Sequence, residues 1–207
     1  VINAYETSKT VLTGLGHKLV EVDFSELSSG ICSYYVIAPA ECSSNLSRFD
    51  GVKYGYRSEG EKDIANLYMN TRSDGFGDEV KKRILIGTHV LSAGFYDAYY
   101  LQAQKVRRMI KVKFENFFKN VDLIFMPTTL DQAFEKNRKS DDPNRMYKED
   151  LLTIPANLAG LPAISFPNGF KNNLPIGGQL IGKYFGEDLL LNTTNKIQEV
   201  TDWHKMT

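Results

Sequence analysis

The chain has 207 residues, of which 42% are hydrophobic and 24% are charged, the composition of an ordinary soluble globular protein. Its length suits one domain, or one domain and part of another. Its 25 basic and 25 acidic side chains leave no net charge, so bulk electrostatics favours neither nucleic acid nor a membrane surface as a partner. No apolar run approaches the roughly 20 residues that span a bilayer.

The first 24 residues predict a helix, a turn and a strand. Apolar side chains recur at helical spacing at Ala4, Val11 and Leu12, and glycines then predict a turn at residues 14–16. "KLVEVDF", residues 18–24, alternates apolar and polar side chains with the period of a strand. A helix that feeds a strand after a short glycine turn is typical of an α/β sheet.

The next segments predict two helices separated by a loop. Residues 33–49 are mostly apolar and small, which predicts a buried helix with Pro39 early in it. Glycines interrupt residues 50–62 and predict a loop. Residues 77–92 predict a second helix. One of its faces carries Val80, Ile84 and Leu91.

A longer helix and a strand are expected to follow. Gly94 is expected to end the preceding helix, and the next helix reaches about residue 119. Its predicted buried stripe consists of Phe95, Tyr99, Val106, Ile110, Phe114 and Phe117. Residues 121–129 predict a buried strand that ends at Pro127, and the polar residues 131–149 predict an excursion from the core.

The last third predicts a helix, a hairpin and a closing helix. Residues 151–161 are expected to be at least partly helical. "PAISFPNGF" and "GGQLIGKYF" predict two strands, joined by the turn-rich "KNNLP". Residues 186–204 predict a helix. Its inward side chains are expected to include Leu189, Leu190 and Ile197.

Common catalytic and cofactor motifs are absent: the sequence has no GxGxxG, GxxxxGK[ST], HExxH or GxSxG. The three histidines lie far apart, which favours ordinary polar roles over zinc binding. Cys32 and Cys42 are interpreted as structural thiols in a reducing compartment. The basic run at residues 105–113 is interpreted as a solvated helix face, with nucleic-acid contact as the alternative. The start, which lacks Met and any signal-like region, suggests part of a longer or processed protein.

Four stretches of the chain closely resemble the amidase-signature family. They are "YYVIAPAECSSNLSRFDGVKYGYR", "GFGDEVKKRILIGTHVLSAGFYDAYYLQAQKVR", "DDPNRMYKEDLLTIPANLAGLPAISFPNG" and "PIGGQLIG". Within the family they look like the glutaminase (A) subunits of tRNA-dependent amidotransferases. The resemblance implies that residues 1–207 form the carboxy-terminal half of a single amidase-signature domain. It implies an α/β fold with a mixed β-sheet flanked by helices, incomplete without the amino-terminal half.

The resemblance implies a glutamine-binding role for three residues. Arg83 would hold the α-carboxylate, because a guanidinium can bind a carboxylate through two hydrogen bonds. Asp150 would accept a hydrogen bond from the α-ammonium, and Tyr34 would lie nearby. The alternatives are a solvated Arg83 in "KKR", a helix N-cap role for Asp150, and a buried aromatic role for Tyr34. The family's catalytic Lys and two Ser lie in the other half, so no catalytic residue and no metal ligand is expected here.

The resemblance also implies partners. The whole complex would use ATP and magnesium, neither of which this chain would bind. It would contain B and C subunits and act on glutamine and mischarged tRNA. It would work in the cytoplasm or in an organelle, without a membrane. This chain alone is expected to be inactive. Asn168, where the family often has Cys, and Leu130, where it often has Pro, depart from the pattern at positions that are expected to lie in loops. The alternatives are another amide hydrolase and a non-catalytic amino-acid-binding module.

Overall fold

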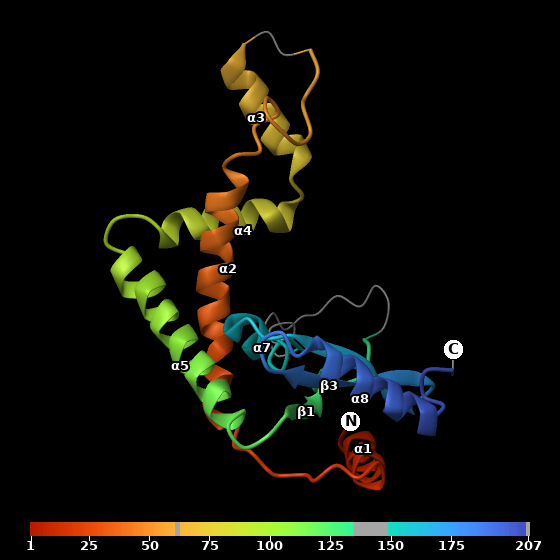
Figure 1. The fold of residues 1–207 in the computed structure, drawn as a ribbon. Coiled ribbons are helices and arrows are strands. Elements are labelled where there is room, and N and C mark those ends of the chain that lie inside the picture. The colour runs from red at the N-terminus through yellow and green to blue at the C-terminus, as the bar shows by residue number, and fades with distance from the viewer. Residues whose placement is uncertain (61–62, 135–148, 206–207) are drawn as a thin grey trace. The chain divides into compact units, whose positions relative to one another are not determined.

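The computed structural model describes residues 1–60, 63–134 and 149–205 (Figure 1). The chain forms two compact units. The first, called the sheet unit here, comprises Val1–Ile31 and Arg107–Thr207. The second, called the helical unit, is Cys32–Val106. Two helices, α2 (Gly30–Leu46) and α5 (Leu101–Phe117), contribute residues to both units.

The sheet unit contains three antiparallel strands, with the last strand in the middle. They are β1 (Leu123–Pro127), β2 (Ala163–Lys171) and β3 (Leu174–Gly182), in the order β1-β3-β2. Asn172 and Asn173 join β2 to β3 with φ angles of 52° and 61°. Asparagine tolerates this left-handed conformation, which matches the twist of a two-residue hairpin. The strand predicted within residues 121–129 and the hairpin predicted in the last third of the chain are confirmed, as is the α/β class.

Two helices cover one face of the sheet. They are α1 (Ile2–Gly14) and α8 (Glu187–Val200). Their core cluster consists of Leu12, Phe166, Leu180, Leu190 and Ile197. The prediction for Leu189 is wrong, because this side chain is 45% exposed. The buried residues of α8 recur every three or four positions from Leu190, and Leu189 lies about 100° around the helix from that stripe.

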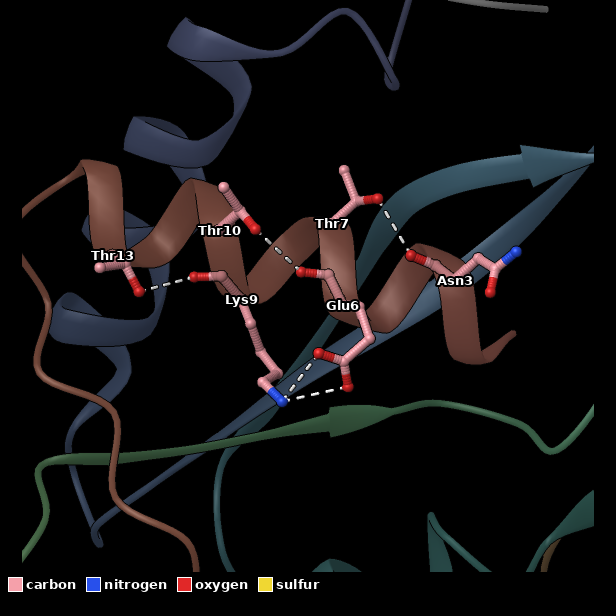
Figure 2. Close-up of polar contacts among 6 residues, drawn as sticks. All are labelled: Asn3, Glu6, Thr7, Lys9, Thr10 and Thr13. Atoms are coloured by element: carbon pink, nitrogen blue, oxygen red, sulfur yellow. Dashed lines mark hydrogen bonds and ion pairs between the residues drawn. The ribbon is translucent and has the colours of Figure 1, made fainter.

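The outer face of α1 satisfies its polar groups locally (Figure 2). Three hydroxyls donate to carbonyls four residues earlier, at 2.9–3.3 Å: Thr7 to Asn3, Thr10 to Glu6 and Thr13 to Lys9. Lys9 also donates to Glu6 at 3.0 Å, and this hydrogen bond raises the pKa of Lys9 above its ordinary value. The opposite face of α1 is thereby left to pack on the core through Leu12.

A second layer of the sheet unit is built around α7 (Ile154–Ala159) and the carboxy-terminal part of α5. A β-carbon on Gly30 would lie 3.1 Å from the Ile110 side chain and 3.4 Å from that of Leu158, so the start of α2 packs closely there. The Nε of Arg107 donates to the Leu158 carbonyl at 3.0 Å. Ile110 and Phe114 are buried, as predicted.

The strand predicted at residues 18–24 is wrong. Residues 17–24 have no regular structure and lead into the 3-10 helix η1 (Ser25–Ser29). A strand needs a neighbour that pairs with its backbone N–H and C=O groups. The three described strands pair only with one another, and Leu19 and Val20 are 42% and 54% exposed. The alternation of apolar and polar residues was therefore not enough to predict a strand.

The helical unit contains α3 (Ile64–Gly75), α4 (Asp78–Val90) and the π-helix η2 (Tyr96–Tyr100), with parts of α2 and α5. The helix predicted at residues 77–92 is confirmed, and so is the loop at 50–60. Pro39 lies in the middle of α2 rather than early, because the helix already begins at Gly30. The predicted buried stripe is wrong at Phe95 and Tyr99, which are 38% and 50% exposed. They lie at a π-helical segment, whose period differs from that of an α-helix.

The remaining expectations concern the polar excursion, the two cysteines and membrane-spanning helices. Most of the excursion predicted at residues 131–149 lies outside the described residues. Both cysteines are free thiols, with Cys32 exposed and Cys42 half-buried. Within the described residues, no helix is both long and apolar enough to cross a membrane.

Candidate amino-acid-binding site

Tyr34 and Arg83 come together in the helical unit, from α2 and α4. These helices approach so closely that a β-carbon on Gly87 would lie 1.9 Å from the Pro39 carbonyl oxygen. Arg83 is one turn before Gly87, and residues four apart share a helix face. The close approach at Gly87 therefore directs the face of α4 that carries Arg83 toward α2.

The guanidinium of Arg83 is held by two side chains. Its Nε donates to Glu79 Oε1 at 3.0 Å, one turn earlier on α4. The pKa of Arg83 is raised above its ordinary value, first by the hydrogen bond with Glu79. Partial burial opposes this effect, and a hydrogen bond with Tyr34 adds to it. The Arg83 side chain is 35% exposed. With five N–H donors, a guanidinium that contacts Glu79 and Tyr34 can still bind a carboxylate.

Tyr34 is not simply a core aromatic. Its residue is half-buried, and its ring meets that of Tyr35 edge-to-face with centroids 5.1 Å apart. Edge-to-face contact is one of the geometries that aromatic pairs prefer. Its interaction with Arg83 uses the phenol as a polar group. This arrangement suits a residue that orients the guanidinium.

Asp150 lies in the sheet unit, in the turn before α7. It is half-buried. Its carbonyl accepts from the amides of Thr153 and Ile154 at 3.2 and 3.0 Å, and from the Thr153 hydroxyl at 3.2 Å. The helix N-cap alternative is wrong, because the N-cap of α7 is Thr153, and no side-chain capping bond is formed there. Asp150 is therefore part of the turn through the hydrogen bonds of its backbone carbonyl.

Sequence reasoning missed the residue that ties this turn to the sheet. Gln179 of β3 is 3% exposed, and its Nε2 donates to the carbonyls of Leu152 and Pro127 at 2.8 and 3.2 Å. The available signal was weak: a polar side chain within the apolar run of a central strand. Such a buried amide is expected to be hydrogen-bonded.

The two glycines before Gln179 make room for side chains of Thr128, just after β1, and Asn168 of β2. A β-carbon on Gly177 would lie 2.8 Å from Thr128 Oγ1, and one on Gly178 would lie 2.9 Å from Asn168 Nδ2. Across Gly177, the hydroxyls of Thr128 and Ser165 are 2.9 Å apart. "GGQ" thus combines two positions without side chains and one amide that reaches the turn carrying Asp150.

The basic run at residues 105–113 is partly engaged within the protein. Lys113 pairs with Glu26 at 3.1 Å, and Lys111 lies over the Tyr184 ring, 5.1 Å from its centroid. Arg107 binds a backbone carbonyl. Among residues 1–60, 63–134 and 149–205, no three His, Cys, Asp or Glu side chains are grouped so that they could hold a metal ion.

Sequence comparison connects the chain to known proteins. The A subunit of glutamyl-tRNA(Gln) amidotransferase from Hahella chejuensis is 56% identical over 205 residues, which are 99% of this chain and 42% of that protein. The protein of the same name from Coxiella burnetii is 53% identical, with the same coverage. The chain therefore spans about two fifths of the length of the curated relatives it matches.

Structure comparison agrees on the fold. The crystal structure of the protein of that name from Thermotoga maritima matches with a TM-score of 0.65 and 40% identity, over 91% of this chain and 36% of that chain. A 6-aminohexanoate cyclic dimer hydrolase matches with a TM-score of 0.68 over 97% of this chain and 41% of its own, but at 20% identity, which speaks for the fold alone. The family model described as Amidase matches residues 1–191. The chain belongs to the amidase family.

Proposed function

We propose that residues 1–207 are the glutamine-recognition, carboxy-terminal half of the glutaminase (A) subunit of a tRNA-dependent amidotransferase. The observation that carries this proposal is the 56% identity over 205 residues to a protein named as such a subunit. The solved amide hydrolase shares only 20% identity and thus only the fold. Function is better inferred from a similar site on a similar sequence than from a shared fold.

The complete protein would hydrolyse glutamine to glutamate and ammonia. Partner B and C subunits, with ATP and magnesium, would use the ammonia to convert Glu-tRNA(Gln) or Asp-tRNA(Asn) into the correctly amidated tRNA, in the cytoplasm or in an organelle. The Lys and Ser residues that form the acyl-enzyme would lie outside this segment. Residues 1–207 produced alone should therefore release no ammonia from glutamine above a buffer blank.

In this scheme the chain supplies the groups that recognise a free amino acid. Arg83 binds the α-carboxylate, because its guanidinium is held in place by Glu79 and Tyr34. Asp150 accepts hydrogen bonds from the α-ammonium. Binding of the α-carboxylate and the α-ammonium would orient glutamine, and such orientation contributes to catalysis by fixing the geometry of attack.

Arg83 can be tested in the full-length protein with two substrates. Arg83→Ala should raise the KM for glutamine by roughly 10- to 100-fold, because a hydrogen bond to a charged group contributes about 1.5–3 kcal/mol. The KM for glutamine α-amide, which lacks the carboxylate, should change little. Lys82→Ala removes an exposed neighbouring charge and is the matched control. Equal losses for both substrates would contradict carboxylate recognition.

Asp150 can be tested in the same way. Asp150→Asn should raise the KM for glutamine by a similar factor and leave that for glutaramate, which lacks the α-ammonium, nearly unchanged. Glu149→Gln removes the adjacent carboxylate as a control. An unchanged KM for glutamine in the Asp150 variant would remove the ammonium-binding role. Ammonia assays report KM and kcat for each variant.

A further inference from the structure

We propose that Gln179 is a positioning residue that holds Asp150 in place for the substrate ammonium. The inference rests on the proposed function, because it assigns a purpose to the turn that carries Asp150. Gln179 itself would not touch glutamine: it is 3% exposed, and its amide nitrogen donates to backbone carbonyls.

The amide of Gln179 joins two segments that are distant in sequence. Nε2 donates at 2.8 Å to Leu152, two residues after Asp150, and at 3.2 Å to Pro127, the last residue of β1. An amide NH₂ group has two donors, so both are used. Rotating the amide by 180° would direct its oxygen at two carbonyl oxygens, so the network fixes its orientation.

The position of Gln179 in the sheet explains why its side chain contacts the turn before α7. It lies in the central strand, paired with Met126 of β1 and Ser165 of β2. Leu180 belongs to the cluster under α1 and α8, and adjacent side chains of a strand point to opposite faces. Gln179 therefore points to the other face, where the turn before α7 lies. Asn would be one methylene shorter, and an ionised Glu would oppose both carbonyls.

The turn also contains short-range backbone hydrogen bonds. The Asp150 carbonyl binds the amides of Thr153 and Ile154, which closes the turn but does not attach it to the sheet. Gln179 provides that attachment through Leu152. Without it, two partly buried carbonyls lose a donor, and we expect the turn to move to find water or another partner. The Asp150 carboxylate would move with it.

The test is Gln179→Leu in the full-length protein with its partner subunits. The KM for glutamine should rise about tenfold, the effect of losing roughly one net hydrogen bond. The KM for glutaramate, or its Ki where it is not turned over, should stay within about twofold, since no ammonium is bound. The kcat for glutamine should also change little. A general distortion would instead impair both compounds, and that result would overturn the proposal.

A double-mutant cycle separates this inference from the proposed function. If Gln179 acts through Asp150, adding Gln179→Leu to Asp150→Asn should raise the glutamine KM little further. Additive effects would overturn the inference. Should Asp150→Asn alone leave the glutamine KM unchanged, the proposed function fails at that residue. Should Asp150→Asn act while Gln179→Leu does not, only the positioning role fails.

Gln179→Glu keeps the test decisive if the Leu variant does not fold. A protonated Glu can donate one bond to Leu152, whereas an ionised one cannot. Burial beside two carbonyls should raise the pKa of this carboxyl, so the glutamine KM should be near the wild-type value at about pH 6 and rise toward about pH 9. A pH profile parallel to that of the wild type would contradict the proposal. Thr128→Val, which breaks the contact with Ser165 across the central strand, is the control for local packing.

Discussion

At the residue scale, we expect the charge of Glu79 to weaken the proposed binding of a second carboxylate by Arg83. The two side chains form an i,i+4 pair, and Glu79 is 58% exposed, so the pair contributes little to folding. Its charge nevertheless repels a carboxylate on the same guanidinium by about 0.5–1 kcal/mol. Glu79→Gln keeps an acceptor for Nε and removes this repulsion. The KM for glutamine should therefore fall roughly 2- to 5-fold in ammonia assays.

Salt provides the control for this prediction. The difference between Glu79→Gln and wild type should shrink as ionic strength rises, because the charges are partly exposed. The KM for glutamine α-amide should not respond to the substitution. A higher glutamine KM in the variant would show that Glu79 matters for the orientation of Arg83 more than for its charge.

The candidate site could be predicted only where a resemblance named its residues. Arg83 and Asp150 lie in different compact units, and no spacing rule of helices or strands connects them. The contact between Tyr34 and Arg83 depends on how α2 and α4 cross, which Gly87 permits but the helical pattern does not reveal. No sequence motif marks Gln179, because its side-chain amide binds backbone carbonyls and therefore needs no particular partner residue elsewhere in the sequence.

At the element scale, the packing of α2 on α4 depends on the missing side chain of Gly87. A β-carbon there would lie 1.9 Å from the Pro39 oxygen and 2.8 Å from the Ser43 β-carbon, so the helices would have to separate. Overpacking of this kind costs typically about 1–3 kcal/mol. Gly87→Ala should lower the free energy of unfolding of the full-length protein by at least that amount, measured in urea.

A second helical glycine provides the comparison. A β-carbon on Gly14, the last residue of α1, would meet nothing within 4 Å. Gly14→Ala should leave stability unchanged or raise it by about 0.5–1 kcal/mol, because alanine restricts the unfolded chain and favours helix. If both variants behaved alike, close helix packing at Gly87 would not be the cause of its effect.

Elements were predictable where their signals are local. Helical stripes and turn residues located α1, α4, α8 and the β2–β3 hairpin. The strand expected at residues 18–24 failed because strand formation requires a distant partner. Helix α3 was missed because its apolar stripe is short, with Leu67 and Thr71 as its buried residues. Its start did carry a signal: Asp63 accepts from the Asn66 amide at 2.9 Å, an N-cap contact that also lowers the Asp63 pKa.

At the scale of the whole molecule, the described part of the helical unit exposes many large apolar side chains. Leu85 is 71% exposed, and Ile64 and Met69 are each 62% exposed. Aromatic side chains add to them, with Tyr54 and Tyr56 at 52% and 56%. Single exposed hydrophobic residues are normal, but groups of them mark surfaces that contact another protein or another part of the same protein.

Produced alone, residues 1–207 should therefore self-associate and bind a hydrophobic dye. The relatives are more than twice as long as the matched segment. Under the proposed function, the additional chain and the partner subunits should cover part of this surface. Sedimentation velocity should give a concentration-dependent size for residues 1–207 and a constant one for the full-length complex. Leu85→Gln should reduce the association and the dye fluorescence of residues 1–207, whereas Lys82→Gln, on the same helix and exposed, should not. A monodisperse preparation without dye binding would mean that the segment buries these side chains by itself, because exposed apolar groups of this extent otherwise promote association.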